Sequence, residues 1–153
     1  MSISIYESDI IDVEFGERVK IVKPVNLFSC KISDDCFIGP FVEIQSDVCI
    51  GEKTKVQSHS FICSLVTIGK NCFIGHGVMF INDKFSKGTP AQGDKTLWKK
   101  TNIGDNVYIG SNATILPVNI CDKVVIGAGA VVTKDISEPG FYAGNPAKRM
   151  RNK

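Results

Sequence analysis

The sequence predicts an all-β fold, a parallel β-helix built from six-residue repeats and interrupted by one long loop. A large apolar residue stands at every sixth position in one unbroken series: Ile32, Ile38, Ile44, Ile50, Val56, Ile62, Ile68, Ile74 and Phe80. An α-helix needs apolar residues three and four positions apart, and a half-buried strand needs strict alternation. A period of six fits neither, but it fits a short strand followed by a tight turn, and three such units close one triangular coil.

Two further observations support the repeat and place its one break. The residue after the apolar one is often glycine, as at Gly39, Gly51, Gly69, Gly75, Gly104, Gly110 and Gly127. The fourth residue after it is small or β-branched, as at Cys36, Val42, Val48, Thr54, Ser60, Val66, Cys72 and Val78. After residue 80 the apolar series stops, and it resumes at Ile103, Ile109, Ile115, Ile120, Ile126 and Val132. Residues 81–102 are therefore predicted to leave the coil as an extended loop, which we call the excursion.

Six cysteines raise the question of a disulfide framework or a metal site, but none of them forms a CxxC pair. In the repeat, Cys36, Thr54 and Cys72 fall in one inward column of successive coils. Coils stack about 4.8 Å apart, so the two cysteines would lie roughly 9 to 10 Å apart. This exceeds the limit of about 7 Å between the Cα atoms of a disulfide. We interpret these cysteines as small buried residues.

The two ends of the repeat depart from its pattern. Toward the N-terminus the six-residue phase loosens, as expected of an atypical capping coil. Toward the C-terminus, Pro139, Gly140 and Pro146 are expected to stop the coil. A cap of about residues 137–153 would follow, with the basic tail in a short turn or helix. We predict a single domain over residues 1–153.

Charge and composition exclude several classes of protein. The formal net charge is +2 and no lysine- or arginine-rich block dominates any stretch, which argues against nucleic-acid binding. The N-terminus lacks the basic and apolar regions of a signal peptide and no run is long enough for a membrane span, so a cytoplasmic location is expected. The motifs GxGxxG, GxxxxGK[ST], GxSxG and HExxH are absent, and with them the sequence support for the corresponding nucleotide-binding, hydrolase and metalloprotease sites.

Two segments carry a resemblance to a known family. Residues 126–132, IGAGAVV, followed by residues 144–148, GNPAK, resemble the C-terminal signature of the hexapeptide-repeat acyltransferases. Residues 73–83, FIGHGVMFIND, are similar to the segment before the excursion in N-acetyltransferases of nucleotide-linked 3-amino sugars. The resemblance covers about residues 19–149. It is this resemblance, and not the spacing, that implies a left-handed coil.

The resemblance also implies a homotrimer with active sites at the subunit interfaces and with acetyl-CoA as co-substrate. The acyl group would pass to the amino group of a dTDP- or UDP-linked 3-amino sugar, in the biosynthesis of a cell-surface polysaccharide such as lipopolysaccharide. Some members of the family hold the nucleotide with a larger N-terminal domain. This chain has no room for one, which leaves open how the base is bound.

Histidines and one asparagine are the candidate catalytic residues. His59 and His76, the only histidines, fall on outward positions 17 residues apart, near the same corner on successive coils. Imidazole can accept a proton near neutral pH, so His76, together with His59, is a candidate general base for an attacking amine. Asn82, where the chain leaves the coil, could orient that amine. Alternatively, both histidines are solvated corner residues and the amine attacks without a protein base.

The excursion supplies the candidate contacts to the sugar nucleotide. They are Asn82, Asp83, Lys84, Phe85 and Trp98, with charge for a diphosphate and rings for a flat base. Loops of this length are usually functional or disordered. Alternatively, Asp83 forms an ordinary Asx turn, the lysines keep the loop soluble and Trp98 packs against the next subunit.

Acetyl-CoA is expected to lie along the upper coils, where glycine-rich turns offer backbone amides and basic side chains can meet phosphates. The candidates are Gly110, Ser111, Gly127, Ala128, Gly129, Lys134, Lys148 and Arg149. The tight turns of the coil need glycine in any case, so the glycines alone do not identify a cofactor site. No metal is expected.

Three other functions fit the same repeat. An O-acetyltransferase acting on a sugar or serine hydroxyl would depend more strongly on a histidine base, because a hydroxyl is a poorer nucleophile than an amine. A γ-type carbonic anhydrase shares the coil but binds zinc through three histidines, one more than this chain has. A non-catalytic β-helix scaffold subunit predicts no binding of CoA.

Overall fold

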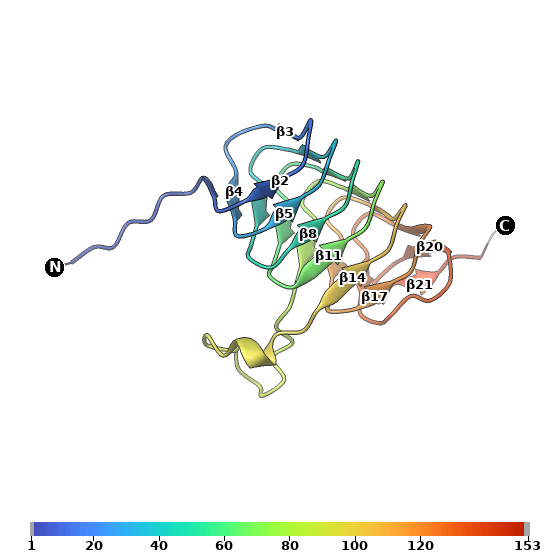
Figure 1. The fold of residues 1–153 in the computed structure, drawn as a ribbon. Coiled ribbons are helices and arrows are strands. Elements are labelled where there is room, and N and C mark those ends of the chain that lie inside the picture. The colour runs from blue at the N-terminus through green and yellow to red at the C-terminus, as the bar shows by residue number, and fades with distance from the viewer. Residues whose placement is uncertain (1, 152–153) are drawn as a thin grey trace.

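The computed structural model describes residues 2–151 and shows a parallel β-solenoid of about seven coils, each contributing one short strand to each of three sheets (Figure 1). Sheet A contains, in spatial order, β1 (Ile10–Ile11), β4 (Asn26–Phe28), β7 (Glu43–Ile44), β10 (Phe61–Ile62), β13 (Met79–Phe80), β16 (Thr114–Ile115) and β19 (Val131–Val132). Sheet B contains β17 (Asn119–Ile120), β14 (Thr101–Ile103), β11 (Val66–Ile68), β8 (Cys49–Ile50), β5 (Lys31–Ile32) and β2 (Glu14–Phe15). Sheet C contains β21 (Lys148–Arg149), β20 (Gly140–Ala143), β18 (Val124–Ile126), β15 (Tyr108–Ile109), β12 (Phe73–Ile74), β9 (Lys55–Val56), β6 (Phe37–Ile38) and β3 (Lys20–Ile21). The predicted β-helix is confirmed.

The core is the predicted column of apolar residues. Every large apolar residue of the repeat from Ile32 to Val132 is at most 3% exposed. Identical positions of neighbouring coils pair in parallel register, as Ile44 does with Ile62. Burying a side chain of this size stabilises the fold by about 1.5–3 kcal/mol. Each coil therefore depends on its neighbours above and below to cover its interior.

The small positions of the repeat have a packing role. A Cβ atom at Gly51 would lie 2.5 Å from the carbonyl group of Gly69 in the next coil, so only glycine fits there. Cys36 and Cys72 are buried free thiols whose Sγ atoms each lie 3.1 Å from a backbone carbonyl oxygen. Between them, the Thr54 hydroxyl donates to the Gly69 carbonyl at 2.8 Å and accepts from the Cys72 amide at 3.0 Å. The interpretation of these cysteines as buried small residues is confirmed.

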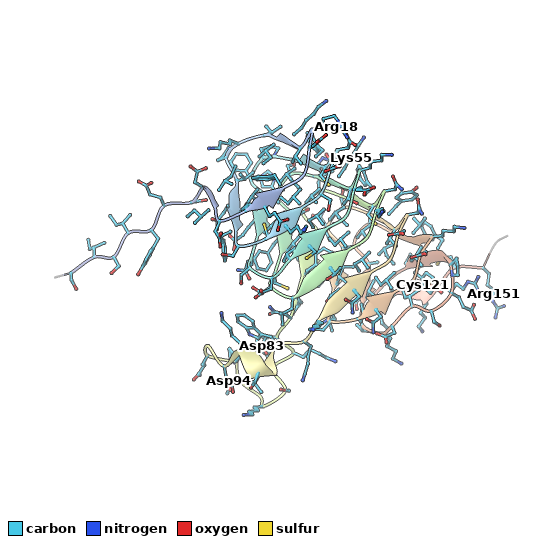
Figure 2. All side chains as sticks on the ribbon, in the orientation of Figure 1. Arg18, Lys55, Asp83, Asp94, Cys121 and Arg151 are labelled. Atoms are coloured by element: carbon cyan, nitrogen blue, oxygen red, sulfur yellow. The ribbon has the colours of Figure 1, made fainter. Side chains whose placement is uncertain are left out.

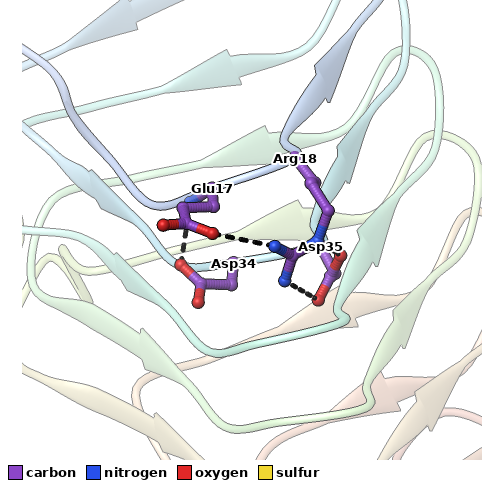
Figure 3. Close-up of polar contacts among 4 residues, drawn as sticks. All are labelled: Glu17, Arg18, Asp34 and Asp35. Atoms are coloured by element: carbon purple, nitrogen blue, oxygen red, sulfur yellow. Dashed lines mark hydrogen bonds and ion pairs between the residues drawn. The ribbon is translucent and has the colours of Figure 1, made fainter.

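At the N-terminal end the solenoid begins earlier than the sequence pattern indicated. The first coil starts at β1, and Arg18 joins it to the second coil through two contacts with the Asp35 carboxylate, at 2.7 and 2.9 Å (Figure 3). The backbone amide of Glu17 donates to Asp34 at 2.8 Å in the same cluster. Polar contacts between neighbouring turns thus replace the apolar regularity that this coil lacks.

At the C-terminal end the expected stop at Pro139 and Gly140 is wrong. Pro139 lies at a corner, where its missing N–H interrupts no ladder, and β20 still pairs in parallel with β18. The chain then turns, and β21 runs antiparallel to β20, so residues 148–149 form a strand and not a helix. Residues 152–153 of the predicted cap lie outside the described residues.

The corners of the triangular coil position the functional residues. We name each corner by the sheets that it joins: AB, BC, and CA, which leads into the next coil. The excursion leaves at an AB corner between β13 and β14, projects from the side of the solenoid and contains one 3-10 helix, η1 (Lys95–Leu97) (Figure 1). No helix within residues 2–151 has the length and apolar character needed to cross a membrane.

Candidate active site

One edge of the solenoid, the CA corner, collects most of the predicted site residues. It is a stack of four-residue turns at residues 22–25, 39–42, 57–60, 75–78, 110–113 and 127–130. His59 and His76 both lie on it and both are exposed. The predicted cofactor turns that begin at Gly110 and Gly127 stand directly above them on the same edge.

Backbone hydrogen bonds fix how these turns stack. The carbonyl of His76 accepts from the amide of Asn112 at 2.9 Å, and the carbonyl of Ser111 accepts from the amide of Gly129 at 2.9 Å. The second residues of the turns therefore form one column: Ser58, His76, Ser111 and Ala128. His59 is offset by one residue, and it belongs to the column of third residues: Phe41, His59, Gly77, Asn112 and Gly129. The two histidines are thus diagonal neighbours on coils about 4.8 Å apart.

The column of third residues has a left-handed backbone, with φ between 59° and 69°. At its lower end the rings of Phe41 and His59 stack, with centroids 4.9 Å apart and planes inclined by 30°. Phe41 is 57% exposed. His59 is therefore one half of an aromatic pair on the surface, and not an isolated solvated residue.

The glycines of the two predicted cofactor turns are there for different reasons. A Cβ atom at Gly110 would lie 2.5 Å from the amide nitrogen of Ala128, so the stacking of coils alone requires glycine there. Gly129 has a φ of 69°, but the space around it is open, with no atom within 4 Å of a Cβ built on it. The upper part of the edge therefore leaves bare backbone accessible at Gly129.

The three basic residues predicted to bind phosphate lie at different places in the structure. Lys148 lies opposite Ala143 in the register of β21 with β20, beside the turn at Gly127. Arg149 is held by Glu138, with its guanidinium 2.7 Å from that carboxylate. Lys134 follows β19 at an AB corner. Within one chain, only Lys148 lies next to the glycine-rich turns.

Asn82 and Asp83 form the neck of the excursion. Asn82 is 9% exposed, and its side-chain amide donates to the carbonyl of Ser64 at 3.0 Å. The carboxylate of Asp83 accepts from the amides of Phe85 at 2.9 Å and Ala91 at 2.7 Å. Figure 2 shows Asp83 where the excursion joins the solenoid. Both residues are engaged in shaping the loop.

Beyond the neck the excursion presents charge and aromatic surface. Lys84 and Phe85 are exposed, and the Phe85 side chain is 57% exposed. Trp98 is half-buried, and the Lys95 Nζ atom lies 5.8 Å from the centroid of its ring. These side chains remain available to a ligand or to another subunit.

The histidine edge and the excursion lie on opposite edges of sheet A. Strand β13 runs between His76 at the CA corner and Asn82 at the AB corner, so the two residues stand at the two ends of one strand. The outer face of sheet A between the two edges carries Phe61 and Met79. Within one chain the histidines and the neck of the excursion therefore lie at different corners of the coil. In residues 2–151 no three His, Cys, Asp or Glu side chains are grouped so that they could hold a metal ion.

Comparison with protein families matches the coils on both sides of the excursion. The model described as the bacterial transferase hexapeptide (six repeats) matches residues 29–64. The model described as the hexapeptide repeat of succinyl-transferase matches residues 65–80 and 100–134. The chain belongs to the hexapeptide-repeat transferase family.

Relatives of this chain differ in length and in the activity that their names state. The bifunctional protein GlmU of Listeria monocytogenes is 33% identical over 150 residues, which cover 86% of this chain and 30% of GlmU, so the chain spans about 30% of the curated relative's length. AntD, an N-acyltransferase from Bacillus cereus solved with dTDP and coenzyme A, superimposes with a TM-score of 0.77 and 19% identity over 90% of this chain and 82% of AntD. A galactoside acetyltransferase solved with coenzyme A has a TM-score of 0.69 and 31% identity over 81% of this chain and 64% of its own.

One prominent residue on the CA corner, Phe41, could not be recognised from the sequence. The repeat places Phe41 at a variable position, where nothing distinguishes it from a solvated residue. The available signal was its place in the turn, because the corresponding residues of the later turns include Gly77, Asn112 and Gly129, types that tolerate a left-handed backbone. A phenylalanine in that position is unusual.

Proposed function

We propose that this protein is an acetyl-CoA-dependent N-acetyltransferase acting on the amino group of a dTDP- or UDP-linked 3-amino sugar in the cytoplasm, in cell-surface polysaccharide biosynthesis. The observation that carries the proposal is the continuous CA edge, on which His76 stands one coil below the turn at Gly110 and two coils below the open turn at Gly129. A base and a surface for the thioester are thereby neighbours. The similarity to AntD, which was solved with dTDP and coenzyme A, supports the acceptor.

The edge supports acyl transfer in a defined order. The sugar amine attacks the thioester carbonyl, a C–N bond forms, and the C–S bond to CoA breaks. In our proposal His76 accepts the proton that the amine loses, and that proton passes to the departing thiolate. His59 borders the same position from the coil below. Gly110, Ser111, Gly127, Ala128, Gly129, Lys134, Lys148 and Arg149 are the proposed CoA contacts.

The excursion is proposed to complete the site from a neighbouring subunit of a homotrimer. Its own histidine edge lies across sheet A, so a second copy can bring Lys84, Phe85 and Trp98 to the acceptor. Because Asn82 already binds the Ser64 carbonyl of the coil below and Asp83 binds backbone amides of its own loop, we assign them the role of shaping the excursion. Charged and aromatic side chains on the excursion suit a diphosphate and a sugar or base.

An O-acetyltransferase is the second candidate, because the galactoside acetyltransferase is 31% identical over the aligned region. A neutral hydroxyl is a poorer nucleophile than a neutral amine and must give up its proton as it attacks, so this reaction would depend on His76 more strongly. The two candidates therefore differ in the acceptor and in how far they need a base.

The test is a substrate panel with purified protein and acetyl-CoA. We expect mass spectrometry to detect acetylation of dTDP- or UDP-linked 3-amino sugars and none of the hydroxyl sugars lacking an amine. Acetylation of a galactoside or of serine, without acetylation of any amino sugar, would establish the O-acetyltransferase instead. A scaffold subunit would show no rise in the thermal midpoint with acetyl-CoA, whereas an enzyme that binds it gains stability by mass action.

A further inference from the structure

Phe41 is exposed in a backbone conformation that disfavours it. Its φ is 61°, in the left-handed region, and its side chain is 57% exposed. A left-handed backbone costs a bulky L-residue roughly 1–2 kcal/mol. Neither burial nor backbone preference explains a phenylalanine here. Strain that folding does not require is typical of residues retained for function.

The surroundings of the ring form a small site. His59, one coil above, covers the ring by stacking at 4.9 Å. Between this coil and the one below, a hollow of about 200 Å³ is lined by Phe41, Val42 and Glu43 above and by Pro24, Val25 and Asn26 below, with Ser8 at its side. Ser8 lies at the edge of this hollow, with its hydroxyl donating to a backbone carbonyl at 3.2 Å. The side of Phe41 away from His59 thus faces a hollow with polar groups around it.

These groups match a pyrimidine base. The side-chain amide of Asn26 offers a donor and an acceptor side by side, which is the complement of the N–H and C=O edge of uracil or thymine. The carboxylate of Glu43 is a further acceptor and already receives an N–H of Gln45 at 3.0 Å. The Phe41 ring supplies a stacking face, and a base stacked on an aromatic ring gains about 1–3 kcal/mol. The small hollow favours a single-ring base.

The distance between Phe41 and His76 along the CA corner also fits a nucleotide sugar. The turn of Phe41 lies two coils below that of His76, roughly 10 Å along the solenoid axis. A ribose and a diphosphate can occupy the interval between a base at Phe41 and an amino sugar at His76. The turn at Gly110, one coil above His76, would then meet the thioester.

We propose that the pyrimidine base of the nucleotide sugar stacks on Phe41, in the hollow beside Asn26 and Glu43. This proposal rests on the proposed function and gives the base of the nucleotide sugar a place on the CA corner. Base, amino sugar and acetyl-CoA then follow one another along the CA corner. The excursion is left to contact the diphosphate and the sugar.

The test compares Phe41→Asn with Phe41→Tyr. Asparagine tolerates a left-handed backbone, so Phe41→Asn removes the ring without a folding penalty, and its thermal midpoint should equal or exceed that of the wild type. Calorimetry with free UDP and dTDP should show Kd raised about tenfold to a hundredfold in Phe41→Asn and little changed in Phe41→Tyr. Asn26→Ala should likewise raise the Kd for both UDP and dTDP. The Kd for CoA should stay the same in all three variants.

Four results would overturn the base site. Wild-type affinity for UDP and dTDP in a folded Phe41→Asn variant removes the stacking role, and loss of affinity in Trp98→Leu instead places the base on the excursion. Weaker CoA binding or a changed oligomeric state in Phe41→Asn assigns the ring to the cofactor or to a subunit contact. Tighter binding of GDP or ADP excludes the pyrimidine. With any of these four results, the wild-type protein would still acetylate amino sugars. If the proposed function itself is wrong, the wild-type protein acetylates no amino sugar.

Discussion

His76 is the proposed general base, and its replacement gives the most direct test of the proposed chemistry. His76→Ala should lower kcat at least about a hundredfold if the imidazole removes the amine proton, because general-base catalysis contributes about 10²–10⁴-fold. The thermal midpoint should not change, since the side chain is exposed. Steady-state kinetics with the amino-sugar acceptor measures the effect.

Ser58→Ala is the matched control for this substitution. Ser58 occupies the same place in its turn one coil lower. Its replacement tests whether the loss of any polar side chain in this column lowers kcat. A His76→Ala enzyme with wild-type kcat would mean that the amine loses its proton without a protein base.

Two buried threonines give a test of what the small inward positions contribute. Thr54 and Thr101 are both fully buried, but the Thr54 hydroxyl makes two hydrogen bonds to the next coil, whereas Thr101 Oγ1 has no hydrogen-bond partner within residues 2–151. Thr54→Val should therefore lower the free energy of unfolding by about 1–3 kcal/mol, because it leaves a buried carbonyl and amide unpaired. Thr101→Val should be neutral or stabilising. Denaturant unfolding at equal protein concentration compares them, and equal losses would refute the distinction.

The inward residues could be predicted from the sequence and the outward ones could not, for a physical reason. Burial repeats with the six-residue period, so Ile44, Thr54 and Cys72 were assigned to the interior by counting alone. Exposed positions have no such constraint, and their neighbours depend on the register between coils. Phe41 and His59 are 18 residues apart and so fall on successive coils, but the stacking of their rings becomes visible only in the structure.

At the level of elements, the excursion is held by its neck. Asp83→Ala removes the carboxylate that binds the amides of Phe85 and Ala91, hydrogen bonds of a charged group that are worth roughly 1.5–3 kcal/mol each. We expect trypsin to cut the excursion at least about tenfold faster, while the thermal midpoint of the solenoid stays unchanged.

Asp94→Ala is the control for this loop. Its carboxylate accepts from the amide of Thr96 at the start of η1, further out on the excursion, so its effect should stay local (Figure 2). Equal protease sensitivity of Asp83→Ala and wild type would show that the backbone holds the neck without the carboxylate.

The first coil should respond to acid before the rest of the solenoid. The Arg18 guanidinium holds the pKa of Asp35 below its ordinary value of 3.8. A carboxylate with a lowered pKa in the folded state contributes stability above the ordinary pKa, and that stability is lost as the pH falls through the lowered value. Hydrogen exchange at the Lys20 amide, which donates to the Cys36 carbonyl, should therefore accelerate below about pH 4. The effect should be small because both partners are partly exposed, and Arg18→Gln should remove the pH dependence.

At the scale of the whole molecule, the repeat predicts the solenoid but not how the site is assembled. Counting from Phe80 to Ile103 locates the excursion in the chain. It does not give the conformation of the excursion, which depends on contacts such as those of Asp83 with the amides of Phe85 and Ala91. The six-residue pattern also did not predict where the solenoid begins and ends. Polar contacts such as that of Arg18 with Asp35 hold the first coil, and Pro139 lies at a corner without ending the coil.

The separation of the histidine edge from the excursion leads to a prediction about the assembly. If each site combines His76 of one subunit with the excursion of the next, two inactive variants should restore activity when mixed within one trimer. The first is His76→Ala. The second replaces residues 84–98 by a short Gly-Ser linker, which the neck permits because the amide of Lys99 lies 2.9 Å from the carbonyl of Asn82.

Chains of the two variants, co-expressed with different tags and purified for both, form trimers in which an interface can receive an intact histidine from one chain and an intact excursion from the other. Each mixed trimer should show about a third of the wild-type activity, because one of its three interfaces pairs an intact histidine with an intact excursion. Native mass spectrometry verifies that the mixed particles contain three chains. If mixed trimers are as inactive as their parents, the excursion does not reach a neighbour's histidine, and the reaction must be assigned to groups on the CA corner of a single chain.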